Sequence, residues 1–367
     1  MMLETYKNKS ILITGNSGFK GSWLTIWLES LGAEVTGFSL DIPSSPSNYE
    51  TSNLKDFSNT IFKDIRNLDS LEEAVEQSQP DFIFHLAAQS LVRKSYQSPI
   101  DTFSVNAIGS MNVLEASRAL KKPVTIIMIT SDKAYDNVEW KWGYRENDAL
   151  GGKDPYSASK GMAELGIRSY FKSFIDQKES FQKLGIARAG NVIGGGDWSA
   201  DRIIPDCVKS WSLNEKVKIR NPYATRPWQH VLEPLSGYLA LGASLETNTD
   251  LNGEAYNFGP AADQNYSVSQ LINEIKKNWD NVSWEIASEE KAAPPEAGLL
   301  KLNCDKALID LKWYSTLDFE QTVKFTIDWY KNFYEEKSRN MHEFCKQQID
   351  EYTTLAKNKN IYWAVND

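Results

Sequence analysis

Cysteine and histidine are scarce in this chain of 367 residues, which has three of each. The cysteines Cys207, Cys304 and Cys345 stand far apart and form no C-x-x-C pair. This spacing predicts reduced thiols and excludes a disulfide framework. The histidines are equally dispersed, so we expect no metal site.

Basic charge and long apolar runs are also lacking. The net charge is -9, so the chain has no basic field of the kind that binds nucleic acid. No apolar segment is long enough to span a bilayer, and the N-terminus lacks the apolar region of a signal peptide. We therefore expect a cytoplasmic protein with no membrane partner and no nucleic-acid partner.

Apolar runs of strand length alternate with helical patterns through the first half of the chain. The expected strands are residues 10–14, 34–40, 59–62, 82–86, 124–129 and 184–189. This alternation predicts the α/β class, with a Rossmann-like doubly wound parallel sheet of six strands. We expect a dinucleotide-binding domain over 1–189, to which part of 230–260 returns. A smaller α/β substrate-binding region follows over 190–335, and a peripheral helical tail over 336–367.

A glycine-rich turn, Gly-Asn-Ser-Gly-Phe-Lys-Gly at 15–21, joins the first expected strand to the first helix. Glycines permit a tight turn, and a helix N-terminus offers free N–H groups to a pyrophosphate. Asp41 lies 20 residues beyond Gly21, where a ribose-binding acid is expected. The strand–turn–helix order therefore predicts a dinucleotide site, and the glycine spacing is typical of short-chain dehydrogenases.

The expected cofactor contacts extend from this turn along the ends of the other strands. They are Gly15, Asn16, Ser17, Gly18, Phe19, Lys20 and Gly21 in the turn, Asp41 at the ribose, Asp64 and Ile65 at the adenine, the small-residue stretch Leu86, Ala87 and Ala88, and then Asn106, Tyr156 and Lys160. Asn106 is expected to hydrogen-bond a neighbouring strand.

Ser131, Asp132 and Lys133 directly follow the apolar run 124–129, where the chemistry of an open α/β sheet gathers. Tyr156 and Lys160 are four residues apart at an expected helix start and share one helix face. A lysine ammonium beside a phenol is expected to lower the pKa of the phenol and make it an acid/base. The alternative is a polar strand end with a structural ion pair between Asp132 and Lys133.

Six motifs carry a family resemblance. They are ITGNSGFKGSW at 13–23, SDK at 131–133, GYREND at 143–148, YSASK at 156–160, ARAGNVIGGGD at 187–197 and RPWQHV at 226–231. From about residue 9 to about residue 329, the chain resembles the extended short-chain dehydrogenases that act on nucleotide sugars, and more narrowly the 4,6-dehydratase branch that takes CDP-glucose. Asn16 and Ala134 depart from the expected pattern.

The resemblance implies NAD as cofactor and CDP-glucose as substrate, converted to CDP-4-keto-6-deoxyglucose and water for surface polysaccharide (lipopolysaccharide) biosynthesis. It implies that Tyr156 is the base for the C4 hydroxyl, Lys133 the base for the C5 proton and Asp132 the acid for the leaving hydroxyl. Ser131 would share the O4 proton network, and Lys160 would hold the ribose and tune Tyr156. In the wider dehydratase family a glutamate usually stands where this chain has Lys133.

The substrate contacts that the resemblance implies are Ser90, Asn191, Arg202, Arg226, His230, Asn257 and Glu296, with the two arginines facing the diphosphate. It also implies a homodimer or homotetramer joined through two long helices. Three other readings stay open at this point. They are a dehydratase that uses another nucleotide, a nucleotide-sugar epimerase, and a non-catalytic NAD-binding regulator.

Overall fold

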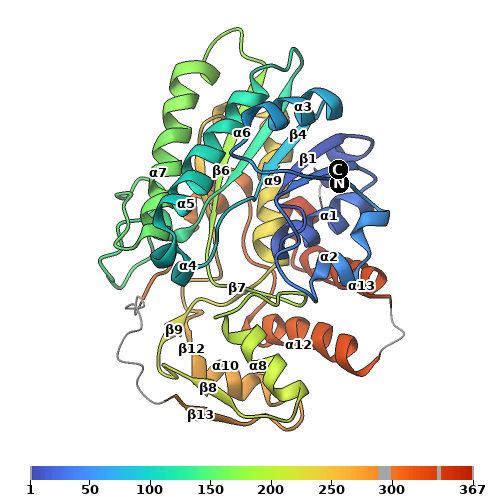
Figure 1. The fold of residues 1–367 in the computed structure, drawn as a ribbon, viewed down its shortest axis with the longest axis vertical. Helices are drawn as coiled ribbons and strands as arrows, with labels where there is room; N and C mark the ends of the chain where they lie inside the picture. The colour runs from blue at the N-terminus through green and yellow to red at the C-terminus, as the bar shows by residue number, and fades with distance from the viewer. Residues whose placement is uncertain (1, 288–298, 337–339, 366–367) are drawn as a thin grey trace.

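A seven-stranded parallel sheet forms the centre of the computed structural model, which describes residues 2–287, 299–336 and 340–365 (Figure 1). The strand order is β11-β6-β5-β4-β1-β2-β3. The strands are β1 Ser10–Thr14, β2 Glu34–Ser39, β3 Asn59–Phe62, β4 Phe82–His85, β5 Val124–Ile129, β6 Gln182–Ala189 and β11 Ala255–Phe258. The order reverses between β1 and β4, which confirms the predicted doubly wound class and places the ligand crevice at that switch point.

Helices cover both faces of the sheet because its strands are apolar on both faces. Ile11 and Ile13 of β1 pack with the core on the side of α1 (Phe19–Ser30) and α9 (Leu232–Thr247), whereas Leu12 packs on the opposite side. That opposite side holds α3 (Leu68–Ser78), α6 (Gly109–Ser117) and α7 (Pro155–Tyr170). Alternate residues of one strand therefore serve two cores, as the period of a β-strand requires.

The predicted count of six strands is wrong by one, because β11 adds an edge strand beside β6. Residues 255–258 of β11 pair in parallel with residues 186–189 of β6. Helix α9 makes the crossover that brings the chain back from the smaller region. The pairing partner is about 70 residues away in sequence, and so a local pattern of four residues could not reveal it.

Short elements build the smaller region at one end of the sheet (Figure 1). Its strands pair two by two: β7 (Val192–Ile193) with β10 (Gln229–His230), β8 (Val217–Ile219) with β13 (Trp284–Ile286), and β9 (Thr225–Arg226) with β12 (Tyr266–Ser267). Its helices are α8 (Ile203–Ser212), α10 (Val268–Ile275) and α12 (Phe319–Glu335), and α11 (Asp305–Leu311) lies against β11. The remaining helices are α2 (Asn48–Thr51), α4 (Val92–Gln97), α5 (Pro99–Phe103), α13 (Met341–Asn358) and α14 (Tyr362–Val365).

The C-terminal helix α13 is part of the core, so the prediction of a peripheral tail is wrong for its inner face. Phe344, Cys345 and Tyr352 are buried, and the helix packs on α1. The Tyr352 hydroxyl donates to a carboxylate oxygen of Glu233 at the start of α9, at 3.0 Å. The apolar side chains of α13 recur at helical spacing, which is the pattern of a helix with one buried face. The many charged residues of the segment concealed this pattern.

None of the helices in the described ranges combines the length and apolar composition needed to cross a membrane.

Candidate active site

The glycine turn forms a cradle at the carboxyl end of β1. Gly15 has φ +78°, and a Cβ there would lie 2.8 Å from the backbone nitrogen of Ala87, so the turn and its contact with the β4 loop both require glycine. Gly18 caps α1 without a side-chain hydrogen bond, which leaves the first N–H groups of this 12-residue helix open to a ligand. These features fit the pyrophosphate of a dinucleotide.

Asn16 has its side chain turned into the protein, so its predicted cofactor contact stays a prediction for its backbone. Its amide donates to Thr60 Oγ1 at 2.8 Å and accepts from Ser39 Oγ at 2.8 Å. The residue is fully buried. Asn16 therefore fastens the glycine turn to β2 and β3.

Two carboxylates stand at the ends of β2 and β3, where ribose and adenine are expected. Asp41 is exposed, and its backbone carbonyl accepts from Ser17 Oγ at 2.6 Å, which fixes the strand end against the glycine turn. Asp64 is held by the Arg66 guanidinium, whose hydrogen bonds keep the pKa of that carboxyl below its ordinary value. Ile65 beside it is buried.

Asn106 lies in a π-helical turn, Ser104–Ile108, between α5 and α6, and its amide is committed to the protein. It accepts from the Gln89 N–H at 2.8 Å and donates to the Gln89 carbonyl at 3.0 Å and to Ser159 Oγ at 2.8 Å. A hydrogen bond is thus made, but to the loop after β4, and the predicted cofactor contact of this residue stays a prediction. Asn106 positions the loop that follows Ala87 and Ala88.

The catalytic candidates Ser131, Asp132 and Lys133 form a tight turn at the end of β5. Ser131 caps the 3-10 turn Asp132–Ala134, with its hydroxyl accepting from the Lys133 N–H and donating to Asp132 Oδ1 at 3.0 Å. The carboxylate of Asp132 lies directly over Gly190, where a Cβ would fall 1.9 Å from Oδ2. Burial raises the pKa of Asp132, against the opposing effect of Lys133, which is the direction that a general acid needs.

Helix α7 carries the other two candidates and begins where its sequence predicts. Asp154 caps it by accepting from the Ser157 N–H at 3.0 Å, and Pro155 occupies the first turn, where no N–H is needed. Tyr156 and Lys160 lie one turn apart, and both are buried.

The pKa of Tyr156 is raised, which is opposite to the net lowering expected from the sequence. Burial raises the pKa of Tyr156 to about 12, and this outweighs the lowering by the Ser131 hydroxyl and Arg202. Burial also lowers the pKa of Lys160 to about 8 and that of Lys20 to about 8, with Arg202 adding to the effect on Lys20. Lys20 thus belongs electrostatically to the same site as Asp132 and Lys160.

A small hollow lies beside Asp132. Its walls are Asp132, Gly190, Asn191, Pro227, Gln229, Gly259, Pro260, Leu300, Lys301 and Leu302. Asn191 lines this hollow, and its predicted substrate contact stays a prediction, whereas Gln229, Leu300 and Leu302 were not anticipated. Gln229 is rigidly held, because its amide donates to the Gly190 and Phe258 carbonyls.

His230 and Asn257 do not face this hollow, so their predicted substrate contacts are wrong. His230 is fully buried between the rings of Trp23 and Phe325, and burial lowers its pKa to about 3. The Asn257 amide is used up by Tyr135, Tyr144 and Asn303.

Of the other predicted substrate residues, Arg202, Arg226 and Ser90 do not line this hollow. Arg202 donates to Asp197 at 2.9 Å, and Arg226 donates to the Thr225 carbonyl at 2.8 Å. Ser90 is exposed at the end of the β4 loop. Glu296 lies outside the described residues.

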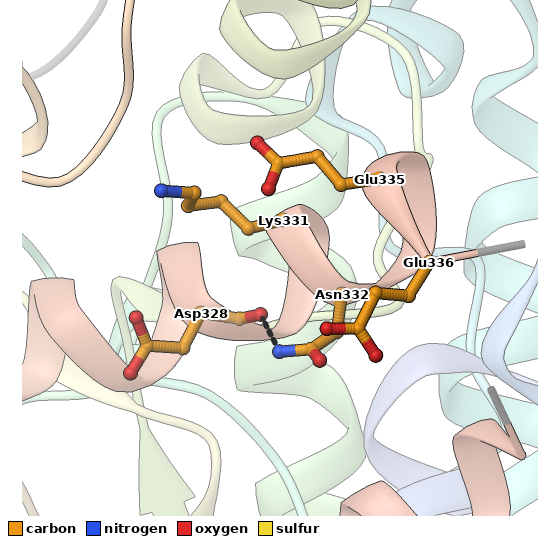
Figure 2. Close-up of a pocket in the computed structure, with 5 residues that line it drawn as sticks. All are labelled: Asp328, Lys331, Asn332, Glu335 and Glu336. Carbon is orange, nitrogen blue, oxygen red and sulfur yellow. Dashed lines mark hydrogen bonds between the residues drawn. The ribbon is translucent and has the colours of Figure 1, made fainter.

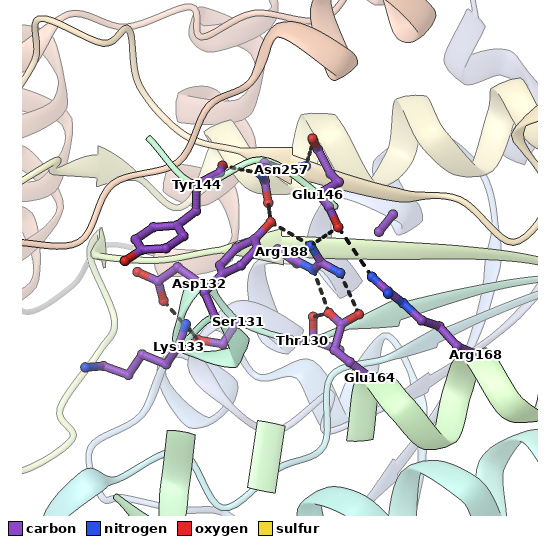
Figure 3. A network of polar contacts seen from close by, with 12 residues as sticks. Thr130, Ser131, Asp132, Lys133, Tyr144, Glu146, Glu164, Arg168, Arg188 and Asn257 are labelled. Atoms are coloured by element: carbon purple, nitrogen blue, oxygen red, sulfur yellow. Dashed lines mark hydrogen bonds and ion pairs between the residues drawn. The ribbon is translucent and has the colours of Figure 1, made fainter. Parts of the chain in front are cut away.

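Behind the catalytic turn lies a buried network that sequence reasoning did not identify (Figure 3). Arg188 of β6 pairs with Glu164 of α7 at 2.7 Å, and both side chains are completely buried. Figure 3 shows the Lys133 side chain extending away from this pair. The network reaches Thr130 and Tyr135, which flank the catalytic turn.

A second hollow lies on α12, lined by Asp328, Lys331, Asn332, Glu335 and Glu336 (Figure 2). All of its lining residues come from this helix and its end, and they include none of the catalytic candidates. We assign it no part in the chemistry.

Comparison with known proteins places this geometry in a family. Residues 12–326 match the family model described as GDP-mannose 4,6 dehydratase. The chain is 42% identical over 355 residues to CDP-glucose 4,6-dehydratase of Salmonella typhimurium, covering 96% of this chain and 98% of that relative.

Solved structures share the fold at low sequence identity. The epimerase Mth375 of Methanothermobacter thermautotrophicus superimposes with a TM-score of 0.76 at 24% identity, covering 92% of this chain and 97% of that one. A dTDP-glucose 4,6-dehydratase of Streptomyces venezuelae, solved with NAD bound, gives a TM-score of 0.72 at 20% identity, covering 88% and 97%.

Proposed function

The chain belongs to the extended short-chain dehydrogenases, in the family described as GDP-mannose 4,6 dehydratase, and from that premise we propose that it is an NAD-dependent 4,6-dehydratase of CDP-glucose. The observation that carries the proposal is the packing of α7, which carries a phenol, on the turn at the end of β5 that carries an acid and an amine. Asp132 and Lys133 follow β5, and Tyr156 stands at the start of α7, which packs on that turn. The product would be CDP-4-keto-6-deoxyglucose and water.

The residues match the difficulty of the reaction. The proton on C5 of a hexose is not acidic until C4 is a ketone, so oxidation at C4 has to precede loss of water across C5–C6. Tyr156 would take the proton of the C4 hydroxyl, with Ser131 in the same proton network. Lys133 would take the C5 proton, and Asp132 would protonate the departing C6 hydroxyl.

NAD fits the glycine cradle, the open N-terminus of α1 and the exposed Asp41. When bound, it would accept the hydride from C4 and return it to C6, so that the net reaction is redox-neutral. Lys160 would hold the ribose, and its charge beside Tyr156 would favour the phenolate. Lys20, in the first turn of α1, would face the negative charge that the cofactor brings.

We expect NAD to bind more tightly than NADP. Asp41 would accept hydrogen bonds from the ribose hydroxyls and repel a 2′-phosphate. Titration of both cofactors, followed by the quenching of protein fluorescence, measures the preference. Equal or tighter binding of NADP would show that Asp41 does not face the ribose and that Lys20 or another cation receives the phosphate.

An epimerase and a dehydratase that uses another nucleotide are the alternatives within the fold. An epimerase does not remove water, and so it has no use for a buried acid and an amine in sequence at the end of β5. Incubation with CDP-, dTDP-, GDP- and UDP-glucose, with chromatographic detection of a 4-keto-6-deoxy product, distinguishes these cases. We expect that product from CDP-glucose, whereas a C4 epimer or no product would refute the proposal.

The outer faces of α5, the π-helical turn Ser104–Ile108 and α7 support a homodimer. Large apolar side chains are exposed there, namely Ile100, Ile108, Met162 and Leu165, and exposure of such a group on neighbouring helices is typical of an interface. We expect Leu165→Asp to yield monomers in sedimentation velocity, because it places a charge in the interface. Leu213→Asp, at an exposed leucine after α8, is the control that should stay dimeric. A monomeric wild-type protein would contradict this assignment.

A further inference from the structure

Burying the charged side chains of Arg188 and Glu164 costs free energy of desolvation. The presence of this ion pair therefore calls for an explanation other than stability. Nε of Arg188 donates to Glu164 Oε1 at 2.7 Å, and Nη2 donates to Oε2 at 2.8 Å. Neither side chain is exposed. Burying two charges gives little or no net stabilisation compared with well-packed apolar residues, so such pairs are a weak source of stability.

The bonds of this pair end on both sides of the catalytic turn. On one side, Glu164 Oε1 accepts from Thr130 Oγ1 at 2.6 Å, immediately before Ser131. On the other side, Arg188 Nη1 donates to the Tyr135 hydroxyl at 2.6 Å, immediately after the turn Asp132–Ala134. The guanidinium also lies 4.8 Å from the centre of the Tyr135 ring. One rigid ion pair therefore holds both ends of the segment that carries the acid and the amine.

The same pair connects this segment to the helix of the phenol. Glu164 follows Lys160 by four residues and Tyr156 by eight, so the three side chains share one face of α7. The Glu164 carboxylate accepts hydrogen bonds from both Thr130 and Arg188. It therefore fixes how α7 is rotated about its axis and shifted along it relative to β5 and β6. The distance between the Tyr156 phenol and the Asp132 carboxyl thus depends on this carboxylate.

The network continues to the wall of the hollow beside Asp132. The Tyr135 hydroxyl donates to Asn257 Oδ1 at 2.8 Å. The Asn257 amide donates to the carbonyls of Tyr144 and Asn303, and Asn303 directly follows Leu302 in the hollow. If the catalytic turn were displaced, the wall of the hollow at Leu302 would therefore be displaced with it.

We propose that Arg188 and Glu164 are positioning residues, which hold the Ser131–Lys133 turn and the Tyr156 helix at the separation that the reaction needs. The inference rests on the proposed dehydratase function for its kinetic consequence, but not for its structural one. Positioning is sensitive to small shifts, since a displacement of about 1 Å can cost about 100-fold in rate.

The test removes one hydroxyl at each end of the turn and leaves the ion pair in place. Thr130→Val and Tyr135→Phe keep side-chain volume and delete the bonds to Glu164 and Arg188. The matched control is Tyr256→Phe, which deletes another phenol hydroxyl, part-buried and bonded to Asp310, on the strand beside β6. Because a charge variant such as Glu164→Gln risks misfolding, these neutral variants decide the question.

Two measurements separate positioning from general destabilisation. With CDP-glucose we expect kcat to fall about 10- to 100-fold in both test variants, with KM changed less than about threefold and the control near wild type. Without any substrate, hydrogen exchange at the amides of residues 133–135 should accelerate in the test variants only, because Ala134 and Tyr135 donate within this turn.

Wild-type kcat together with wild-type exchange in both test variants would overturn the inference, as would equal losses in Tyr256→Phe. A wild-type protein that leaves CDP-glucose unchanged would refute the proposed function instead. In that case the exchange measurement still decides whether Arg188 and Glu164 hold the turn.

Discussion

Tyr156→Phe should lower turnover by about 100- to 10,000-fold, which is the range that general acid–base groups typically contribute. The substitution removes the oxygen that takes the C4 proton and leaves the buried ring in its packing. Initial rates of 4-keto product formation, with bound NAD verified, measure the effect.

Two observations accompany that experiment. The thermal midpoint of Tyr156→Phe should stay close to the wild-type value, since the phenol is bonded only within the site. A folded variant with near-normal turnover would mean that another group accepts the C4 proton.

Lys133→Met and Asp132→Asn should both stop net dehydration but at different points. If Lys133 removes the C5 proton, its variant still oxidises C4, because that step depends on Tyr156. We then expect the absorbance of reduced cofactor to accumulate, while exchange of the C5 proton with solvent stalls. In Asp132→Asn the amine remains and only protonation of the leaving hydroxyl is impaired, so C5 exchange should stay measurable.

The comparison of the two variants assigns the roles. Mass spectrometry of substrate recovered from D₂O gives the C5 exchange, and absorbance gives the reduced cofactor. Free turnover by Lys133→Met, or equal C5 exchange in both variants, would make Lys133 a structural partner of Asp132. The C5 base would then have to be another group near the hollow.

The sheet could be predicted wherever its signal is local. The strands β1 to β6 are short runs bounded by turns and alternating with helical patterns, and each was located from its own residues. Strand β11 lies in the part of 230–260 that was expected to return to the dinucleotide-binding domain, but it was not counted among the sheet strands, because its place in the sheet is set by β6 and not by its own composition. Helix α13 was predicted to be peripheral because its many charged residues obscured a stripe of apolar residues, and these residues are buried.

The candidate site divides in the same way. The glycine turn, the Ser131–Lys133 turn and the spacing of Tyr156 and Lys160 carry their chemistry in sequence order, and so they could be recognised. Arg188 and Glu164 could not, because an arginine in a strand and a glutamate in a helix read as surface charges until the fold buries them together. The opposite error was made for His230. Its place in a conspicuous motif suggested a substrate contact, but the side chain is buried in the core.

The fate of the hydrogen on C4 tests the central claim most directly. CDP-glucose carrying deuterium at C4 is converted by the purified protein, and the product is analysed by NMR. Transfer within one active site predicts that the deuterium appears at C6 of the 4-keto-6-deoxy product. A product formed at the normal rate with only protium at C6 would contradict a dehydratase that oxidises C4 and returns the same hydride.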